Sequence, residues 1–172
     1  MLDIGCGNGW FLKWFKEQSP QSECLGVEQN KDSILECRAK AVEAVPYIPL
    51  SAKTYELITL WGTLEHLKDP KSMINKCSGL LSDRGFLLVC VPNISCDEVK
   101  KKQENAYMFC PQHLWYFDMA SLHEFMHRMG YRISFYYGFN NHYQHVAIFK
   151  KFKSIISSLA TSDRALGQAE RA

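Results

Sequence analysis

The chain has 172 residues, 47% of them hydrophobic, so it is long enough for one core and too short for two comfortable domains. Its 20 basic and 18 acidic residues nearly balance, which argues against a nucleic-acid-binding surface. Seven cysteines without a CxxC pair predict reduced thiols in a cytoplasmic protein, and no apolar run approaches the roughly 20 residues of a membrane span.

Residues 1–9 form the end of an apolar strand that carries Asp3 and runs into glycines at positions 5, 7 and 9. Glycines between a strand and a helix let backbone N–H groups approach a ligand closely, because no Cβ stands in the way. Dinucleotide binders have a further glycine where this chain has Trp10. An acid beside the turn repels a diphosphate and attracts a cationic amine, such as that of S-adenosylmethionine. The residues predicted to bind this cofactor here are Asp3, Gly5, Cys6, Gly7 and Gly9.

The next segments predict a helix, a strand and a second helix. The first helix has an aromatic face that we expect to pack on the sheet, made of Trp10, Phe11, Trp14 and Phe15. The strand 23–28 ends in Glu28, about 20 residues after the turn, where its carboxylate can accept hydrogen bonds from both ribose hydroxyls. Nicotinamide cofactors are bound in the same way, so Glu28 does not discriminate. Asn30 is expected to cap the second helix.

The segment 44–54 is a poor strand, because Pro46 and Pro49 interrupt it. We expect the third strand to lie at an edge of the sheet and to be short or absent, so that the rest of the fold can form without it. The segment identifies no residue that would contact the adenine ring of a cofactor.

The strand 55–61 is followed by the residues with the clearest catalytic potential. The backbone at Trp61 and Gly62 is expected to approach the amino-acid part of the cofactor. Glu65 and His66 come just beyond, at the carboxyl edge of the sheet, and are the best-placed acid and base in the sequence. We predict both as catalytic residues. The alternative is that Glu65 braces the loop and that His66 is a structural histidine.

Helix and strand signals continue to alternate along the chain, which predicts a doubly wound α/β sheet. Asp69 followed by Pro70 is a strong helix start. Asp118 is expected to cap a later helix that ends at Gly130. The last predicted elements are two strands and the tight turn that joins them, at 131–139, 142–150 and 140–141.

An aromatic run precedes the helix that Asp118 caps. We predict that the run lines a substrate pocket through His113, Trp115 and Tyr116, although packing explains such a run equally well. Cys110 and His113 are two potential zinc ligands without a partner pair, so no zinc site is expected there.

Five segments resemble, in the right order, motifs of the class I S-adenosylmethionine-dependent methyltransferases, and within them the small-molecule group that includes ubiquinone-biosynthesis-like enzymes. The segments are 2–9, 25–28, 55–70, 85–93 and 113–117. The resemblance implies a Rossmann-like, mostly parallel sheet with an antiparallel last strand. It also implies S-adenosyl-L-methionine as cofactor and methyl transfer to a small-molecule acceptor, with a hydroxyl as the expected group.

The sequence departs from that family in two places. Family members have helices ahead of the first motif, whereas this sequence begins inside the first strand. We therefore expect 1–150 to be a truncated domain covered by a second copy or a partner chain, and 151–172 to be a partly helical or disordered tail. Ubiquinone-pathway relatives have an acid at the position of Gly62, as part of a metal-associated motif with Glu65 and His66. With glycine there, no metal site is predicted.

Two other functions stay open. The absent N-terminal helices and the shortened third strand fit a non-catalytic or truncated methyltransferase-like domain, which would act as a binding module or subunit. The second alternative is an NAD-linked enzyme, which Trp10 at the position of the third glycine disfavours. Preferential binding of NADH over S-adenosylmethionine would favour it.

Overall fold

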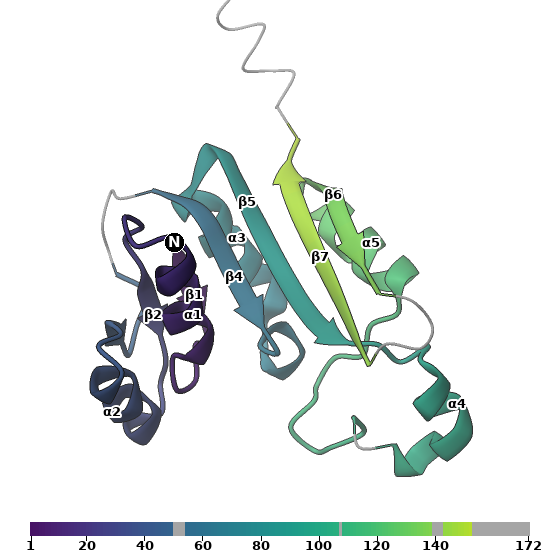
Figure 1. Ribbon diagram of the computed structural model, residues 1–172. Coiled ribbons are helices and arrows are strands. Elements are labelled where there is room, and N and C mark those ends of the chain that lie inside the picture. Colours follow the sequence, from purple (N-terminus) through teal and green to yellow (C-terminus); the bar gives the residue numbers. More distant parts are fainter. Residues whose placement is uncertain (50–53, 107, 139–142, 153–172) are drawn as a thin grey trace, which may run out of the picture.

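The computed structural model describes residues 1–49, 54–106, 108–138 and 143–152. The strands are β1 (Leu2–Ile4), β2 (Leu25–Val27), β3 (Ala44–Val45), β4 (Tyr55–Trp61), β5 (Leu81–Pro92), β6 (Tyr131–Tyr137) and β7 (Gln144–Lys151). They form one sheet in the order β3-β2-β1-β4-β5-β7-β6. Figure 1 labels every strand of this sheet except β3. Neighbouring strands are parallel from β3 to β5, and β7 is antiparallel to both β5 and β6. The predicted fold class is confirmed.

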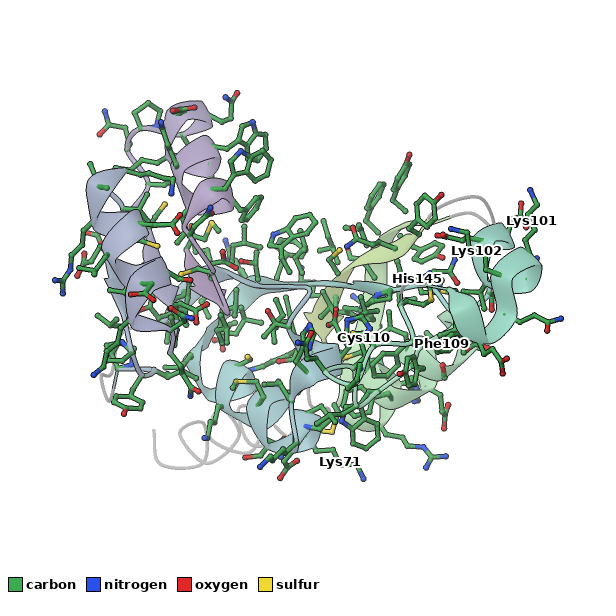
Figure 2. All side chains as sticks on the ribbon, turned by 90° about the horizontal axis from the view of Figure 1, so that it is seen from below. Lys71, Lys101, Lys102, Phe109, Cys110 and His145 are labelled. Atoms are coloured by element: carbon green, nitrogen blue, oxygen red, sulfur yellow. The ribbon has the colours of Figure 1, made fainter. Side chains whose placement is uncertain are left out.

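Helices cover both faces of this sheet, but not all of each face. They are α1 (Trp10–Gln18), α2 (Lys31–Ala39), α3 (Pro70–Leu80), α4 (Asp97–Lys102) and α5 (Met119–Arg128), with the 3-10 turns η1 (Leu64–His66) and η2 (Gln103–Asn105). Figure 2 shows α1 and α2 on one face and α3 and α5 on the other. None of the described helices is long and apolar enough to cross a membrane.

The third strand is present but has only two residues, at the edge of the sheet beside β2. It is held by backbone hydrogen bonds from Gly26 N to Glu43 O at 2.9 Å and from Glu28 N to Val45 O at 3.0 Å. Pro46 follows directly and has no N–H to donate, so the pairing stops there. The expectation of a short edge strand is confirmed.

The three predicted helix caps are all formed. Asn30 accepts hydrogen bonds from two backbone N–H groups at the start of α2, at 2.9 and 3.1 Å. Asp69 accepts one from Ser72 in α3 at 2.9 Å, and Asp118 accepts one from Ser121 in α5 at 2.7 Å. The predicted turn at 140–141 lies outside the described residues.

Asp118→Ala is expected to lower the free energy of unfolding by about 1 kcal/mol, because the first turn of α5 loses its N-terminal hydrogen bond. Hydrogen bonds from Ser121 hold the pKa of Asp118 below its usual value. The carboxylate therefore stabilises the fold above about pH 4, and this contribution disappears as the pH falls through the lowered pKa. Urea unfolding at pH 7 and pH 3 tests this: the difference between variant and wild type should shrink at pH 3. An equal difference at both values would contradict the assignment.

The first helix packs differently from the prediction. Leu12 is fully buried and joins a small core with Cys6, Ile34 and Cys37, which α1 and α2 form against β2 at Gly26. The aromatic face was expected to be buried on the sheet, but Trp10 is 68% exposed. That expectation is wrong for Trp10 and Trp14, because the aromatic side of α1 borders an open cavity over the sheet instead of packing closely on it.

The uncovered part of the sheet is apolar. On the face that α1 shares, β5 carries Phe86 and β6 carries Phe135 and Tyr137, all of them exposed by a third or more. Lys150 on β7 lies over the Phe86 ring, with Nζ 5.2 Å from the ring centroid. Contiguous exposed apolar surface of this kind is typical of binding sites. It begins next to the glycine-rich segment.

Candidate functional site

The glycine-rich segment forms a loop between β1 and α1. Its three glycines have positive φ values of 73° at Gly5, 54° at Gly7 and 76° at Gly9, a region that side-chain-bearing residues rarely adopt. The N–H groups of Gly5 and Cys6 both donate to Val27 O, at 2.8 and 3.1 Å, and so join the loop to β2. The glycine spacing read from the sequence therefore reflects a real backbone requirement.

The three glycines differ in what surrounds them. A Cβ on Gly5 would stand 2.4 Å from Thr63 Oγ1, and one on Gly9 would stand 2.9 Å from Cys37 Sγ. A Cβ on Gly7 would meet nothing within 4 Å. Gly5 and Gly9 are thus required by packing within the protein, whereas Gly7 borders open space that a ligand can fill.

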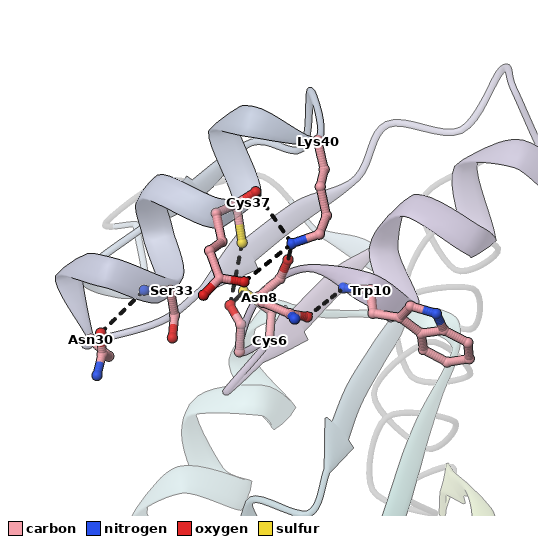
Figure 3. Close-up of polar contacts among 9 residues, drawn as sticks. Cys6, Asn8, Trp10, Asn30, Ser33, Cys37 and Lys40 are labelled. Carbon is pink, nitrogen blue, oxygen red and sulfur yellow. Dashed lines mark hydrogen bonds and ion pairs between the residues drawn. The ribbon is translucent and has the colours of Figure 1, made fainter.

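Side chains at the end of helix α2 also hold the glycine loop in place, as Figure 3 shows. The Cys37 thiol donates to Gly7 O at 3.3 Å, and Lys40 Nζ donates to Asn8 O at 3.0 Å. Asn8 Oδ1 accepts the backbone N–H of Trp10 at 3.3 Å. The loop is therefore fixed before any ligand arrives, which lowers the entropy lost on binding.

Glu28 lies directly against the loop. Its Oε2 accepts the Gly7 N–H at 3.0 Å and its Oε1 accepts the Asn30 N–H at 2.8 Å. Each carboxylate oxygen has a further lone pair, so this bracing leaves room for the predicted contacts with ribose hydroxyls. The geometry puts the carboxylate beside Gly7, and the ribose contact stays a prediction.

Asp3 is a buried acid, with only 1% of its surface exposed. Thr59 Oγ1 donates a hydrogen bond to its Oδ1 at 2.6 Å. Burial raises the pKa of Asp3 to about 7, and the Thr59 hydrogen bond only partly opposes that rise. A cationic ligand group nearby would favour the charged form, so this carboxyl is suited to a ligand that carries an amine.

One cavity of about 730 Å³ connects the glycine loop with the apolar sheet face. Five of the predicted cofactor-binding residues line it: Asp3, Gly5, Cys6, Gly7 and Trp61. The other three predicted cofactor-binding residues do not line the cavity but lie next to residues that do; they are Gly9, Glu28 and Gly62. The rest of the lining is mainly the aromatic face of α1, with Leu57 and Leu88 from the sheet. Sequence reasoning missed this lining role, since an apolar helical face is the usual signal for burial.

β4 ends at Trp61, which lines this cavity, and Gly62 follows it. The Trp61 ring packs against Phe11, with centroids 4.9 Å apart, and its buried Nε1–H has no acceptor among the described residues. Gly62 has a φ of 55°, and its N–H donates to Cys90 O at 2.9 Å. The chain thus turns sharply here and enters η1.

A second cluster lies just beyond, where η1 carries Glu65 and His66. The structure brings His113 to them, and one possible ligand atom from each of the three residues lies within 4.8 Å of the others. The rings of His66 and His113 are 4.7 Å apart in an edge-to-face arrangement. Glu65 is buried, and burial raises the pKa of its carboxyl. Two predicted catalytic residues and one predicted pocket residue therefore form a single site.

Hydrogen bonds between η1 and the segment before α5 hold this cluster together. The backbone N–H groups of Leu114 and Trp115 both donate to Glu65 O, at 2.8 and 3.2 Å. His66 Nδ1 donates to Gln112 O at 2.9 Å, and Trp115 Nε1 donates to Leu67 O at 2.8 Å. Four contacts over a few residues fix the position of His113 relative to Glu65.

The predicted acceptor-pocket residues do not line the cavity next to the glycine loop. Trp115 and Tyr116 are 41% and 39% exposed. The Tyr116 ring packs against Phe109 at 5.3 Å and lies 6.4 Å from the His113 ring. Their contact with an acceptor stays a prediction.

Comparison with known proteins identifies relatives. A family model described as a methyltransferase domain matches residues 1–134. Ubiquinone biosynthesis O-methyltransferase of Aliivibrio fischeri is 26% identical over 104 residues, which cover 54% of this chain and 44% of that protein. The chain therefore matches less than half the length of this curated relative.

Solved structures show the same fold. The CcbJ methyltransferase from Streptomyces caelestis has a TM-score of 0.70 at 16% identity, covering 88% of this chain and 83% of that one. Magnesium protoporphyrin IX methyltransferase from Synechocystis PCC 6803, solved with bound SAH (S-adenosylhomocysteine), has a TM-score of 0.68 at 13% identity and covers 88% and 73%. At these identities the likeness concerns the fold alone.

Proposed function

Because the chain belongs to the methyltransferase domain family, we propose that it transfers a methyl group from S-adenosylmethionine to a hydroxyl of a small-molecule acceptor. The observation that carries the proposal is the joint placement of two groups at the carboxyl ends of β1 and β4. These groups are a preformed glycine loop with a buried acid, and a carboxylate–imidazole cluster.

The loop supports the cofactor assignment. Gly7 borders open space at the cavity, and the Glu28 carboxylate lies beside it, where it would accept hydrogen bonds from ribose hydroxyls. Asp3 would be the partner of the amine of the methionine part. A diphosphate would bring negative charge next to the carboxyls of Asp3 and Glu28, which disfavours a dinucleotide.

The cluster supports a hydroxyl acceptor. Methyl transfer is an in-line displacement at carbon, and a hydroxyl attacks well only when it loses its proton. Glu65, His66 and His113 provide groups that can take or displace that proton. The apolar, aromatic lining around Trp61 and Phe11 favours an acceptor with a flat, hydrophobic body.

The direct test is turnover with a panel of acceptors. The protein would be incubated with isotope-labelled S-adenosylmethionine and phenols, catechols, aliphatic alcohols and amines, and the labelled products identified by mass spectrometry. Methyl ethers of one or more hydroxyl compounds are the expected products. Methylation of amines alone would refute the hydroxyl assignment. A folded protein without S-adenosylmethionine binding would instead favour the non-catalytic alternative.

Glu65→Gln is expected to lower kcat for a hydroxyl acceptor by roughly 10²-fold, the effect typical of a lost acid–base or proton-displacing group. The affinity for S-adenosylhomocysteine should change less than about twofold, because Glu65 does not line the cavity beside the glycine loop. Glu56→Gln, at an exposed position at the start of β4, is the matched control and should leave both values unchanged. Equal kcat for Glu65→Gln and wild type would exclude a catalytic role.

A further inference from the structure

Glu65 is a buried acid in the cluster with His66 and His113, and its surroundings suit a ligand-binding role in addition to acid–base chemistry. Only 2% of Glu65 is exposed, and its Oε2 has no hydrogen-bond donor among the described residues. A buried carboxylate oxygen without a partner is costly unless a cation or donor is bound there. The unpartnered oxygen is therefore suited to bind a cation or a hydrogen-bond donor.

Both histidines are oriented to present a lone pair. His66 Nδ1 lies 2.9 Å from Gln112 O, and His113 Nδ1 lies 2.6 Å from Met108 O. A carbonyl oxygen can only accept, so each Nδ1 carries the proton and each neutral ring keeps a free lone pair on Nε2. Metal-binding histidines are typically held in this way, with the other ring nitrogen donating to a backbone carbonyl.

We infer that Glu65, His66 and His113 bind a divalent transition-metal cation. Two imidazoles and one carboxylate are a common ligand set for such cations and leave coordination positions open for other ligands. The ligand atoms already lie within 4.8 Å of one another, so small side-chain rotations bring them onto one ion. His66 is exposed, which gives the ion a path from solvent.

Three side chains of the described residues make up this ligand set, and the neighbouring position 62 adds none to it. Here Gly62 has no side chain to offer, and a Cβ at this position would stand 3.6 Å from Glu65 Oε1. His113 approaches from a segment 47 residues later and supplies the third ligand. The sequence alone left two ligands, and the third comes from the fold.

The metal site specifies how the proposed methyltransferase would activate its hydroxyl acceptor. This catalytic role of the metal rests on the proposed function. A divalent cation lowers the pKa of a coordinated hydroxyl, so the acceptor hydroxyl would release its proton to solvent water, which reaches the site at the exposed His66. The resulting oxyanion would take the methyl group from the sulfonium, and S-adenosylhomocysteine would leave. Glu65, His66 and His113 would then hold the ion and orient the acceptor oxygen. Binding of the ion itself depends only on the three side chains.

The test is Co²⁺ binding, followed by visible absorption and by equilibrium dialysis. His123 and His127 on α5 lie one helical turn apart, with ring centroids 5.9 Å apart, and can bind metal weakly on their own. All measurements are therefore made in a His123→Ala/His127→Ala background, which touches neither the loop nor the cluster. One equivalent of Co²⁺ is expected, displaced by Zn²⁺.

His113→Asn and His66→Asn are the informative variants. The asparagine amide reproduces the Nδ1 donor toward Met108 O or Gln112 O and removes only Nε2, so the local hydrogen bonds are retained. Each variant should bind Co²⁺ at least about tenfold more weakly. Cys110→Ser is the matched control on the same segment and should bind Co²⁺ as tightly as the background protein. Its Co²⁺ absorption spectrum should also be unchanged, because the Cys110 thiol is not a ligand.

Thermal unfolding and S-adenosylhomocysteine binding separate the possible outcomes. Zn²⁺ should raise the Tm of the background protein but not of His113→Asn, while both bind S-adenosylhomocysteine equally. Absence of stoichiometric Co²⁺ uptake, or equal uptake by His113→Asn, would overturn the metal site even if hydroxyl methylation is found. Uptake that depends on His66 and His113 in a protein without methyl transfer would support the site and refute the proposed function.

Discussion

Replacing Asp3 with asparagine is expected to weaken cofactor binding and at the same time to stabilise the unliganded protein at alkaline pH. The carboxyl lies in the core with a pKa of about 7, against an ordinary value of 3.8. A pKa raised in the folded state means that stability is complete below about pH 4 and falls as the pH rises toward 7, because only the unfolded state ionises freely in that range.

Asparagine removes this pH-dependent loss and still accepts the Thr59 hydrogen bond through its Oδ1. After the cost of burying its amide group, Asp3→Asn should raise the free energy of unfolding by about 1 to 3 kcal/mol at pH 8. At pH 4 the two proteins should be nearly equal. Urea unfolding at both values measures this. A variant that is less stable than wild type at pH 8 would show that the carboxylate is stabilised by a contact other than Thr59.

Cofactor binding by the same variant should change in the opposite direction. Loss of the charged partner for the cofactor amine is expected to raise the Kd for S-adenosylhomocysteine by roughly 10- to 100-fold. In wild type the affinity should increase from pH 5.5 to 7.5 as Asp3 loses its proton, and in Asp3→Asn it should be flat. Calorimetry gives both curves. Asp83→Asn, an exposed carboxyl in the amino-terminal half of β5, is the control and should follow wild type.

Gly7→Ala and Gly5→Ala are expected to separate ligand binding from folding. At Gly7 a methyl group fits without a clash, so the variant should lose about 1 kcal/mol of stability from its positive φ alone. The methyl group would occupy the space that a ligand needs, and the Kd for S-adenosylhomocysteine should rise at least about tenfold. At Gly5 the methyl would stand against Thr63 Oγ1, so stability should fall by about 2 to 4 kcal/mol.

Gly130→Ala is the matched control for backbone strain. Gly130 has a φ of 83° and open space around its Cβ position, and it lies after α5, outside the cavity beside the glycine loop. This variant should lose the same stability as Gly7→Ala and bind the cofactor product normally. Normal binding by Gly7→Ala would mean that the ligand does not approach this backbone, and the site would have to be placed elsewhere.

The sequence correctly predicted features that depend on interactions between neighbouring residues in the chain. The capping residues Asn30, Asp69 and Asp118 each act within one helical turn, so their roles can be read from neighbouring residues alone. The glycine spacing also succeeded, because a positive φ is a property of single residues. The short helix α4 was missed, since its charged composition around Lys100 has no apolar periodicity.

The aromatic face of α1 shows where such signals fail. Trp10 and Trp14 have the spacing of a buried stripe, but which face of a helix is buried depends on what lies opposite. Here Leu12 packs against α2 and β2, and the aromatic side borders a cavity over the sheet. The spacing of apolar residues in a helix does not tell which element, if any, lies opposite that face. The role of these residues in lining the cavity could therefore not be predicted.

The sequence by itself determined the glycine loop, the helix caps, the alternation of strands and helices and the family, because these depend on residues close together in the chain. Only the tertiary structure decided the rest. Burial in the core gave Asp3 its raised pKa, and the sheet order placed the segment before α5 against η1. His113 contacts Glu65 and His66, which lie 48 and 47 positions earlier in the chain, and such contacts follow from strand order and burial rather than from periodicity.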